Sequence, residues 1–331
     1  MRRGRSRIEK RAAMKVIALP ILLLFVLAGY AGPQAPPASN GSNSGSFQIS
    51  VDVALVVLNV AVLDRRGGFV SDLFSQSFVV YEDGVPQRIR LFRTEDIPVT
   101  VGLVVDHSTT MWPKLAEVTA AVRTFVHRSN PDDEMFVINF NEHVFQGLPG
   151  TFRFTNSTVE LENAITSAPA SGQTALYDAI TRGLEELQAG SRDKKVLIVV
   201  SDGGDNASAH NLAQVMNLAE RSSAIIYTVG IFGADNPERN PGVLKRLAKA
   251  TGGEAFFPDQ IGEVVAICER IARDIRHQYT IGYVPTNLTH DRAYHAIRVV
   301  VGAKGHDSLS ARTRAGYRTG GEPMLDEKGA K

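Results

Sequence analysis

The sequence predicts an α/β protein: a doubly wound, mostly parallel sheet with short β segments on both sides of it in the sequence. Two observations predict this fold. Apolar strand-like runs alternate with helical patterns between residues 97 and 276, which is the order of a parallel sheet with crossover helices. Residues 47–96 and 277–318 instead show strand-like runs separated by turn signals, without a helical pattern.

The α/β region begins with a continuous apolar run, Val99 to Val105, which is typical of a strand buried on both faces. The helix that follows it has apolar residues at helical spacing. A later helix is expected to stop at Gly252-Gly253, since glycine commonly ends helices. We expect further strands at 136–140, 195–200, 225–231 and 254–257, and helices at 113–129, 159–166, 175–188, 211–222, 240–250 and 262–276.

The flanking segments are predicted to be all β. Residues 65–68 are typical of a hairpin turn, and 78–81 and 89–92 are expected to form a second hairpin across 82–86. A β unit of about 50 residues has a marginal core by itself. We therefore expect the N-terminal and C-terminal β segments to combine into one accessory β layer, the latter with strands at 279–284, 294–301 and 308–317.

The N-terminus is typical of export. Residues 1–31 hold a basic stretch, an apolar run from Val16 to Ala28 and a small-residue cleavage region, the three parts of a signal peptide. An uncleaved membrane anchor is the alternative, but the run is shorter than the roughly 20 residues of a spanning helix. Met14 is an alternative start. A Pro/Gly/Ser-rich linker (32–46) follows, and a disordered tail is expected at 319–331.

The charge excludes some partners. The whole chain has a net charge of +1, but residues 1–31 hold seven of the 36 basic and one of the 35 acidic residues, so the remainder has a net charge of −5. Nucleic-acid binding requires a basic surface, so we expect no nucleic-acid partner. The sequence has no Walker loop and no GxGxxG, so nucleotide binding has no support. The single cysteine, Cys268, fits a buried position in a helix.

Three short segments together carry a possible metal site. Asp106, Ser108 and Thr110 follow the first apolar strand, Thr174 comes from a loop after Gly172, and Asp202 follows another apolar strand. Ligands of open α/β sheets bind beyond the carboxyl ends of the strands, so the two acids should share one sheet edge. Two carboxylates and three hydroxyls are hard oxygen donors, which suit Mg²⁺ better than Zn²⁺.

Each segment alone has a simpler explanation. Asp, Ser and Thr often cap helices or form turns, Thr174 could be the N-cap of the next helix, and Asp202-Gly203 could be a turn. The combination, in this order and at these strand ends, is much more specific. Asp205 could hydrogen-bond one of the metal ligands or be only a turn residue. His107 and Trp112 are possible partner contacts at the rim, although Trp112 would equally fit the core.

The segments resemble the metal-ion-dependent adhesion site (MIDAS) of von Willebrand factor type A domains. That family has Asp-x-Ser-x-Ser, then a distant Thr, then a distant Asp, which correspond here to Asp106, Ser108, Thr110, Thr174 and Asp202. Thr110 replaces the usual second Ser and His107 is an unusual neighbour. The flanks, with residues 78–84, 279–285 and 314–317, are similar to bacterial secreted VWFA-related domain proteins. The resemblance implies a Rossmann-like fold, cation-dependent protein binding and no catalysis.

We therefore expect an exported protein, periplasmic or extracellular, that binds Mg²⁺ (or Mn²⁺ or Ca²⁺) and captures an Asp or Glu side chain of a partner protein. The alternative is a structural module of the cell envelope with a vestigial metal site. A metal-assisted hydrolase is a weaker alternative, because adjacent Asp106, His107 and Ser108 cannot form a catalytic triad. Membrane contact is expected only through the N-terminal segment.

Overall fold

The computed structural model describes residues 55–94, 96–233, 239–287, 294–306 and 308–319. The predicted signal peptide (1–31), the linker (32–46), the first strand-like residues (47–54) and nearly all of the predicted tail (319–331) lie outside the described residues. No helix in the described part is long and apolar enough to cross a membrane.

The centre of the α/β domain is a sheet with the strand order β10-β9-β8-β5-β6-β7. All of these strands are parallel except β7, which is antiparallel to β6. Strands β5 and β8 are buried along nearly their whole length, as the continuous apolar runs predict. The strands are β5 (Val99–Asp106), β6 (Glu134–Phe140), β7 (Val144–Gln146), β8 (Lys194–Ser201), β9 (Ile225–Gly230) and β10 (Ala255–Phe256).

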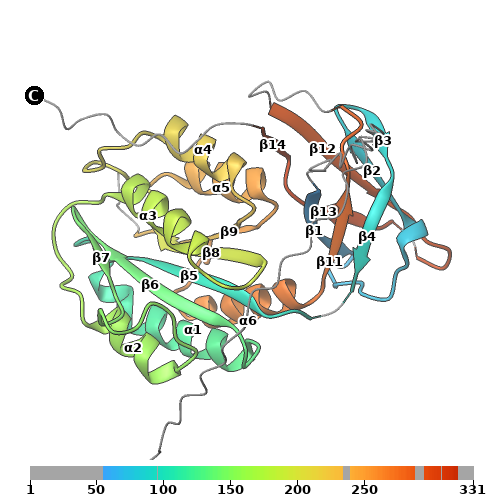
Figure 1. Cartoon of the computed structure of the whole chain (residues 1–331). Helices are drawn as coiled ribbons and strands as arrows, with labels where there is room; N and C mark the ends of the chain where they lie inside the picture. The colour runs from blue at the N-terminus through green and yellow to red at the C-terminus, as the bar shows by residue number, and fades with distance from the viewer. Residues whose placement is uncertain (1–54, 95, 234–238, 288–293, 307, 320–331) are drawn as a thin grey trace, which may run out of the picture. The chain divides into compact units, whose positions relative to one another are not determined.

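Helices cover both faces of this sheet, so the predicted doubly wound α/β fold is confirmed. Figure 1 shows α1, α2 and α6 on one face and α3, α4 and α5 on the other. The last helix contains Cys268, which is buried, and burial raises the pKa of its thiol to about 12. The helices are α1 (Leu115–Arg128), α2 (Thr158–Thr166), α3 (Leu176–Gln188), α4 (Leu212–Arg221), α5 (Pro241–Thr251) and α6 (Glu263–Arg276).

The flanking segments combine, as predicted, but into two sheets rather than one layer. Their orders are β13-β1-β11-β4 and β14-β12-β2-β3, so each sheet mixes strands from before and after the α/β domain. Leu58, Phe78, Val80 and Tyr279 belong to the shared hydrophobic core. The strands are β1 (Val56–Leu63), β2 (Phe78–Glu82), β3 (Val85–Gln87), β4 (Ile89–Arg93), β11 (Gln278–Tyr283), β12 (Tyr294–Val301), β13 (Ser310–Arg312) and β14 (Gly316–Arg318), with short 3-10 turns at Ser75–Ser77 and Trp112–Lys114.

Two details of the β prediction are wrong. The predicted hairpin between 78–81 and 89–92 does not form, because β2 turns at Asp83-Gly84 and pairs with β3, whereas β4 joins the other sheet beside β11. Both turn residues have positive φ (50° and 82°), as a two-residue type I′ turn requires. The predicted strand 308–317 is divided into β13 and β14, which belong to different sheets.

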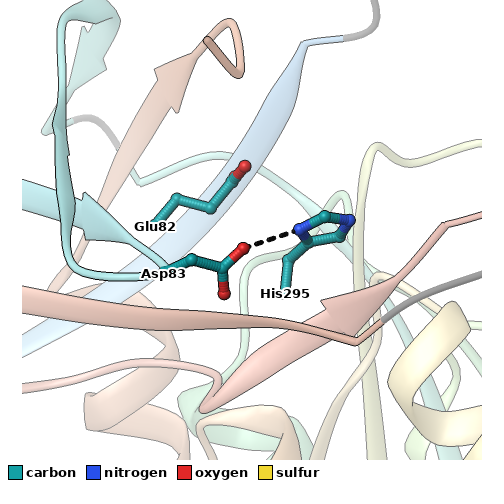
Figure 2. Close-up of side chains that lie close together, drawn as sticks. All are labelled: Glu82, Asp83 and His295. Atoms are coloured by element: carbon teal, nitrogen blue, oxygen red, sulfur yellow. Dashed lines mark hydrogen bonds and ion pairs between the residues drawn. The ribbon is translucent and has the colours of Figure 1, made fainter. Parts of the chain in front are cut away.

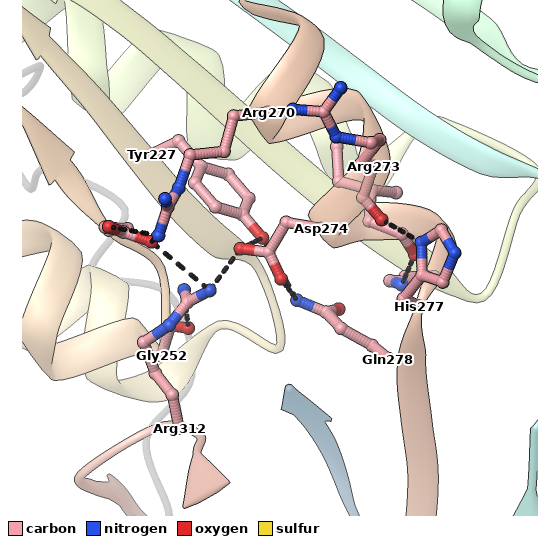
Figure 3. Close-up of polar contacts among 11 residues, drawn as sticks. Tyr227, Gly252, Arg270, Arg273, Asp274, His277, Gln278 and Arg312 are labelled. Carbon is pink, nitrogen blue, oxygen red and sulfur yellow. Dashed lines mark hydrogen bonds and ion pairs between the residues drawn. The ribbon is translucent and has the colours of Figure 1, made fainter. Parts of the chain in front are cut away.

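A buried polar network connects the α/β domain to the β sheets (Figure 3). The carboxylate of Asp274 in α6 accepts hydrogen bonds from Tyr227 of β9 (2.9 Å), Gln278 of β11 (3.3 Å) and Arg312 of β13. Arg312 also donates to the carbonyl of Gly252 at 3.0 Å. Asp274 is fully buried, so these partners supply the hydrogen bonds that water would otherwise make.

Candidate metal centre

The two predicted acidic ligands emerge at the same edge of the central sheet. Asp106 is the last residue of β5 and Asp202 directly follows β8. The two strands are parallel neighbours, with Val105 opposite Val200. Both acids are buried, with 0% of Asp106 and 2% of Asp202 exposed. The sheet therefore places two carboxylates side by side beyond the carboxyl ends of its strands, where open α/β sheets bind ligands.

Hydrogen bonds bring the two acidic loops into contact. Thr110 donates its hydroxyl to Oδ2 of Asp202 at 2.8 Å, and the hydroxyl oxygens of Ser108 and Thr110 are 3.2 Å apart. Asp106 accepts the backbone amide of Ser108 at 2.8 Å through Oδ1 and the hydroxyl of Ser201 at 2.6 Å through Oδ2. Four of the five predicted ligand residues are thus joined in one network.

The fifth predicted ligand, Thr174, lies in a loop that contacts both of the others. The amide of Ser171 donates to the carbonyl of His107 at 2.9 Å. On the other side, the amide of Thr174 donates to Oδ1 of Asn206 at 2.9 Å, and the amide of Asn206 donates back to the carbonyl of Thr174 at 3.0 Å. Gly172 has a φ of 82°, so the sharp turn expected there is present. The three sequence segments therefore meet at one place.

The structure excludes one of the two roles considered for Thr174, the helix cap, and the metal-ligand role stays a prediction. The N-cap of α3 is Ala175, and no side chain of that residue caps the helix. The free amides of the first turn are bonded instead by the loop after β8. Asp205 accepts the amide of Tyr177 at 3.1 Å, and the hydroxyl of Ser208 accepts the next amide at 3.1 Å. Thr174 is therefore not the helix cap, while Asp205 helps to cap α3. That Asp205 also supports a ligand of the cation stays a prediction.

The charged groups of the site influence one another. Burial raises the pKa of Asp106 to about 6, hydrogen bonds from Ser108 and Ser201 oppose this rise, and the charge of Asp202 adds to it. Lys114 lies nearby and donates to the carbonyl of Ile231 at 2.8 Å. Burial lowers the pKa of Lys114, and the charges of Asp202 and Asp106 oppose this effect. Two buried carboxylates and one ammonium group thus interact electrostatically, and added positive charge beside the carboxylates would favour their ionised form.

The geometry is compatible with a small hard cation. In an octahedral shell with metal–oxygen distances of about 2.0–2.1 Å, neighbouring ligand oxygens are about 2.9 Å apart. The separations of 2.8 Å between Thr110 and Asp202 and 3.2 Å between Ser108 and Thr110 are close to this value. The methyl group that distinguishes Thr110 from serine does not keep its hydroxyl from Asp202. The donor oxygens have the chemistry that Mg²⁺ prefers, and these two separations do not conflict with its coordination.

The two predicted rim residues differ. Trp112 is 69% exposed, so it is free to contact a partner near the site. His107 is fully buried, contrary to the prediction, because its side chain points into the protein beside Asn139 and the Ala168 backbone. Burial lowers the pKa of His107. A buried neutral imidazole cannot contact a partner surface directly.

Two further residues of the site were missed in the sequence. Ser201 bonds Asp106 with its hydroxyl, and the same oxygen accepts the amide of Gly203 at 3.0 Å. Its place at the end of an apolar strand, directly before Asp202, is a usable signal. Lys114 gave no comparable signal, because its proximity to the acids depends on how the segment after β5 folds back.

Glycine at position 203 is a requirement of the loop. Gly203 has a φ of 80°, and a β-carbon there would lie 2.6 Å from the carbonyl oxygen of Asn240. The amide of Asn240 donates to the carbonyl of Asp202 at 3.1 Å. The loop after β8 is therefore packed tightly against the start of α5, which fixes the position of Asp202.

A second group of metal-type side chains lies in the β sheets (Figure 2). Ligand atoms of Glu82, Asp83 and His295 lie within 4.8 Å of one another. Internal hydrogen bonds account for this group: Asp83 bonds Nδ1 of His295 at 2.8 Å, and Glu82 accepts the hydroxyls of Tyr283 (2.5 Å) and Tyr317 (3.1 Å). These bonds connect the β2–β3 turn to β12, β11 and β14.

Comparison with known proteins agrees with this fold. The von Willebrand factor type A domain model matches residues 100–267, about half of the 331 residues. No curated protein sequence matches the chain significantly.

Similar solved structures include a von Willebrand factor type A protein from Catenulispora acidiphila (12% identity, 80% of this chain and 72% of that chain covered, TM-score 0.48). Another is the vWF domain of the type V pili tip protein Mfa5 from Porphyromonas gingivalis (14% identity, 54% of this chain and 95% of that chain covered, TM-score 0.47). A third is BatB from Bacteroides thetaiotaomicron (18% identity, 53% of this chain and 98% of that chain covered, TM-score 0.43). On the family match, which covers the central sheet and the segments that carry Asp106, Thr174 and Asp202, the chain belongs to the von Willebrand factor type A domain family.

Proposed function

We propose that this protein is an exported, cation-dependent protein-binding module. Asp106, Ser108, Thr110, Thr174 and Asp202 would hold Mg²⁺, or Mn²⁺ or Ca²⁺ in its place. The bound cation would supply an open coordination position for a carboxylate oxygen of the partner's Asp or Glu. The protein itself would hold these oxygens at one edge of the sheet and surround them with a contact surface for the partner.

One observation carries this proposal: Thr110 and Asp202, from loops far apart in sequence, meet at 2.8 Å. Two buried carboxylates are costly in a folded protein unless positive charge compensates them, and Lys114 supplies one such charge for the two acids. Thr110 and Trp112 are exposed beside the buried acids, so a partner can approach the site. Exposed tryptophan is frequent among residues that dominate binding energy.

A structural role with a vestigial site is the second candidate, and one observation favours it. The hydrogen bonds from Ser201 to Asp106 and from Thr110 to Asp202 satisfy carboxylate oxygens without any cation. In that case the domain would act as a spacer in an envelope assembly. Catalysis is the weakest candidate, because His107, the base available beside Asp106, is fully buried.

Adjacent threonines provide a matched test. Thr110→Val removes the proposed ligand hydroxyl, whereas Thr109→Val removes the hydroxyl of a neighbouring exposed threonine, which among the described residues bonds the carbonyl of Gly172. The immobilised chain would be exposed to an envelope extract of its source organism in Mg²⁺ or in EDTA. We expect wild type and Thr109→Val to retain a partner protein in Mg²⁺ and to lose it in EDTA. Thr110→Val should fail to retain it even in Mg²⁺.

Chemical blocking of the partner's carboxylates should abolish this retention. Retention that is independent of Mg²⁺ and of Thr110 would contradict the function and favour the structural module. Export is proposed from residues 1–31 and is tested separately, by the N-terminal sequence of the protein recovered from cells. A chain that still starts at Met1 or Met14 in the cytoplasmic fraction would contradict it.

A further inference from the structure

A groove of about 600 Å³ lies between the α/β domain and the β sheets, and none of its lining residues belongs to the predicted cation site. Helix α5 and the start of β10 form one wall, and β12 with the segment from β13 to Ala315 forms the other. Its apolar lining includes Ala255, Val299 and Ala311, which are partly exposed. This volume is within the usual range of binding pockets, about 300–1,000 Å³.

The charge of the groove is opposite to that of the rest of the protein. Five basic residues and one acidic residue line it, whereas the chain after residue 31 has a net charge of −5. Arg312 is already paired with Asp274 and Glu254, and Arg314 donates to the carbonyl of Glu220. The other basic residues of the lining remain available to a ligand.

These available cations are Lys245, Lys249 and Arg298, which form no ion pair with any residue in the described part of the chain. The ammonium of Lys245 lies 5.2 Å from the ring centre of Phe257, and the guanidinium of Arg298 lies 4.3 Å from that of Tyr81. Such ring contacts orient a cation without neutralising it. The groove therefore presents positive charge beside apolar surface.

The wall formed by β10 is also an open strand edge. β10 is the outermost strand of its sheet, and among the described strands it pairs only with β9. The amide of Thr228 in β9 donates to the carbonyl of Glu254. Because bonding directions alternate along a strand, the amide and carbonyl of Ala255 face away from β9. An extended peptide can bond to an edge of this kind.

We propose that this groove binds an extended acidic segment of a partner protein, independently of the cation site. The backbone of the segment would pair with Ala255, its acidic side chains would contact Lys245, Lys249 and Arg298, and its alternate apolar side chains would cover the apolar floor. A nucleic acid fits less well, because no aromatic residue lines the groove for base stacking. Carboxylates thus bind here through basic side chains, whereas at the sheet edge they bind through a cation.

The test uses a fluorescent peptide with alternating acidic and apolar residues, acetyl-Glu-Leu-Glu-Val-Glu-amide, titrated with the full chain in EDTA, which removes any contribution of the cation site. The double variant Lys245→Glu/Lys249→Glu reverses two exposed charges of the groove. Arg246→Glu is the matched control, because Arg246 is exposed on the same helix but does not line the groove. Circular dichroism of each variant establishes that it is folded.

We expect saturable binding by wild type that weakens with salt, a loss of at least about tenfold in the double variant, and a change below about threefold in Arg246→Glu. Arg298→Glu should weaken binding as well. Absence of saturable binding by wild type, or equal binding by the double variant, would overturn the proposal.

Two other results would assign the groove to a different occupant. Tighter binding of a single-stranded oligonucleotide that displaces the peptide would indicate a nucleic-acid site. Peptide binding that strengthens about tenfold when the chain ends at Thr319 would indicate that its own residues 320–331, with Glu322, Asp326 and Glu327, occupy the groove. Either result would overturn the proposal of a partner segment.

Discussion

Thr110 donates its hydroxyl to Asp202 across 92 positions of the sequence, at a distance of 2.8 Å. This bond joins the loop after β5 to the loop after β8, which are the two central strands of the parallel sheet. The loops are held together because the strands that precede them are buried and paired in register. The predicted cation site is thus assembled by the fold itself.

The stabilisation by Mg²⁺ should depend on pH. Burial raises the pKa of Asp106 from 3.8 to about 6. The cation-free protein is therefore more stable when Asp106 is protonated, and this stabilisation is present at low pH and lost as the pH rises through about 6. Cation binding requires the deprotonated carboxylate. We therefore expect Mg²⁺ to raise the melting temperature at about pH 7.5 and to have little effect at about pH 5.

Thermal denaturation with and without Mg²⁺ at both pH values measures this effect. Asp106→Asn is the control, since its side chain does not titrate in this range. An equal rise in melting temperature at the two pH values would show that Asp106 does not bind the cation.

Asp205 should contribute to stability more than to cation binding. Its carboxylate accepts the amide of Tyr177 in the first turn of α3, so Asp205→Ala should lower the free energy of unfolding by about 1–2 kcal/mol, as loss of a helix cap does. Urea denaturation measures this change. The affinity for Mn²⁺ should remain within about threefold of wild type; a tenfold loss in the folded variant would assign Asp205 to the surroundings of the cation.

Asp274 should be essential to the junction between the α/β domain and the β sheets. Asp274→Ala leaves the largely buried Arg312 without its main partner, so we expect a loss of about 3–5 kcal/mol in the free energy of unfolding. Glu254→Ala removes the second, more exposed carboxylate, 3.6 Å from Arg312, and should cost about 1 kcal/mol or less. Similar losses in the two variants, measured in urea, would contradict the central place of Asp274.

The sequence was sufficient to predict the parallel strands of the central sheet, because buried parallel strands are continuous apolar runs and their helices have a clear period. The short antiparallel strand β7 was not predicted. The positions of Asp106 and Asp202 followed from the same pattern, since a residue directly after a parallel strand must lie at its carboxyl edge. The burial of His107 could not be predicted, because the pattern does not show which side of an irregular loop faces the core.

The accessory sheets were predicted less well. The turn at Asp83-Gly84 is a strong hairpin signal, but the separation of β3 from β4 a few residues later depends on the partner strand β11, almost 200 positions away in the sequence. Pairing over that distance leaves no local pattern. For the same reason, neither the network around Asp274 nor the groove beside β10 was visible in the sequence.

The central claim is a divalent cation at the edge of the sheet, and isothermal titration calorimetry tests it most directly. Wild type, Asp106→Ala and Asp202→Ala would be titrated with Mg²⁺ and with Mn²⁺, with circular dichroism to establish that each is folded. We predict saturable binding of one ion by wild type and its loss in both variants. Undiminished binding by the variants, or no binding by wild type, would contradict the claim.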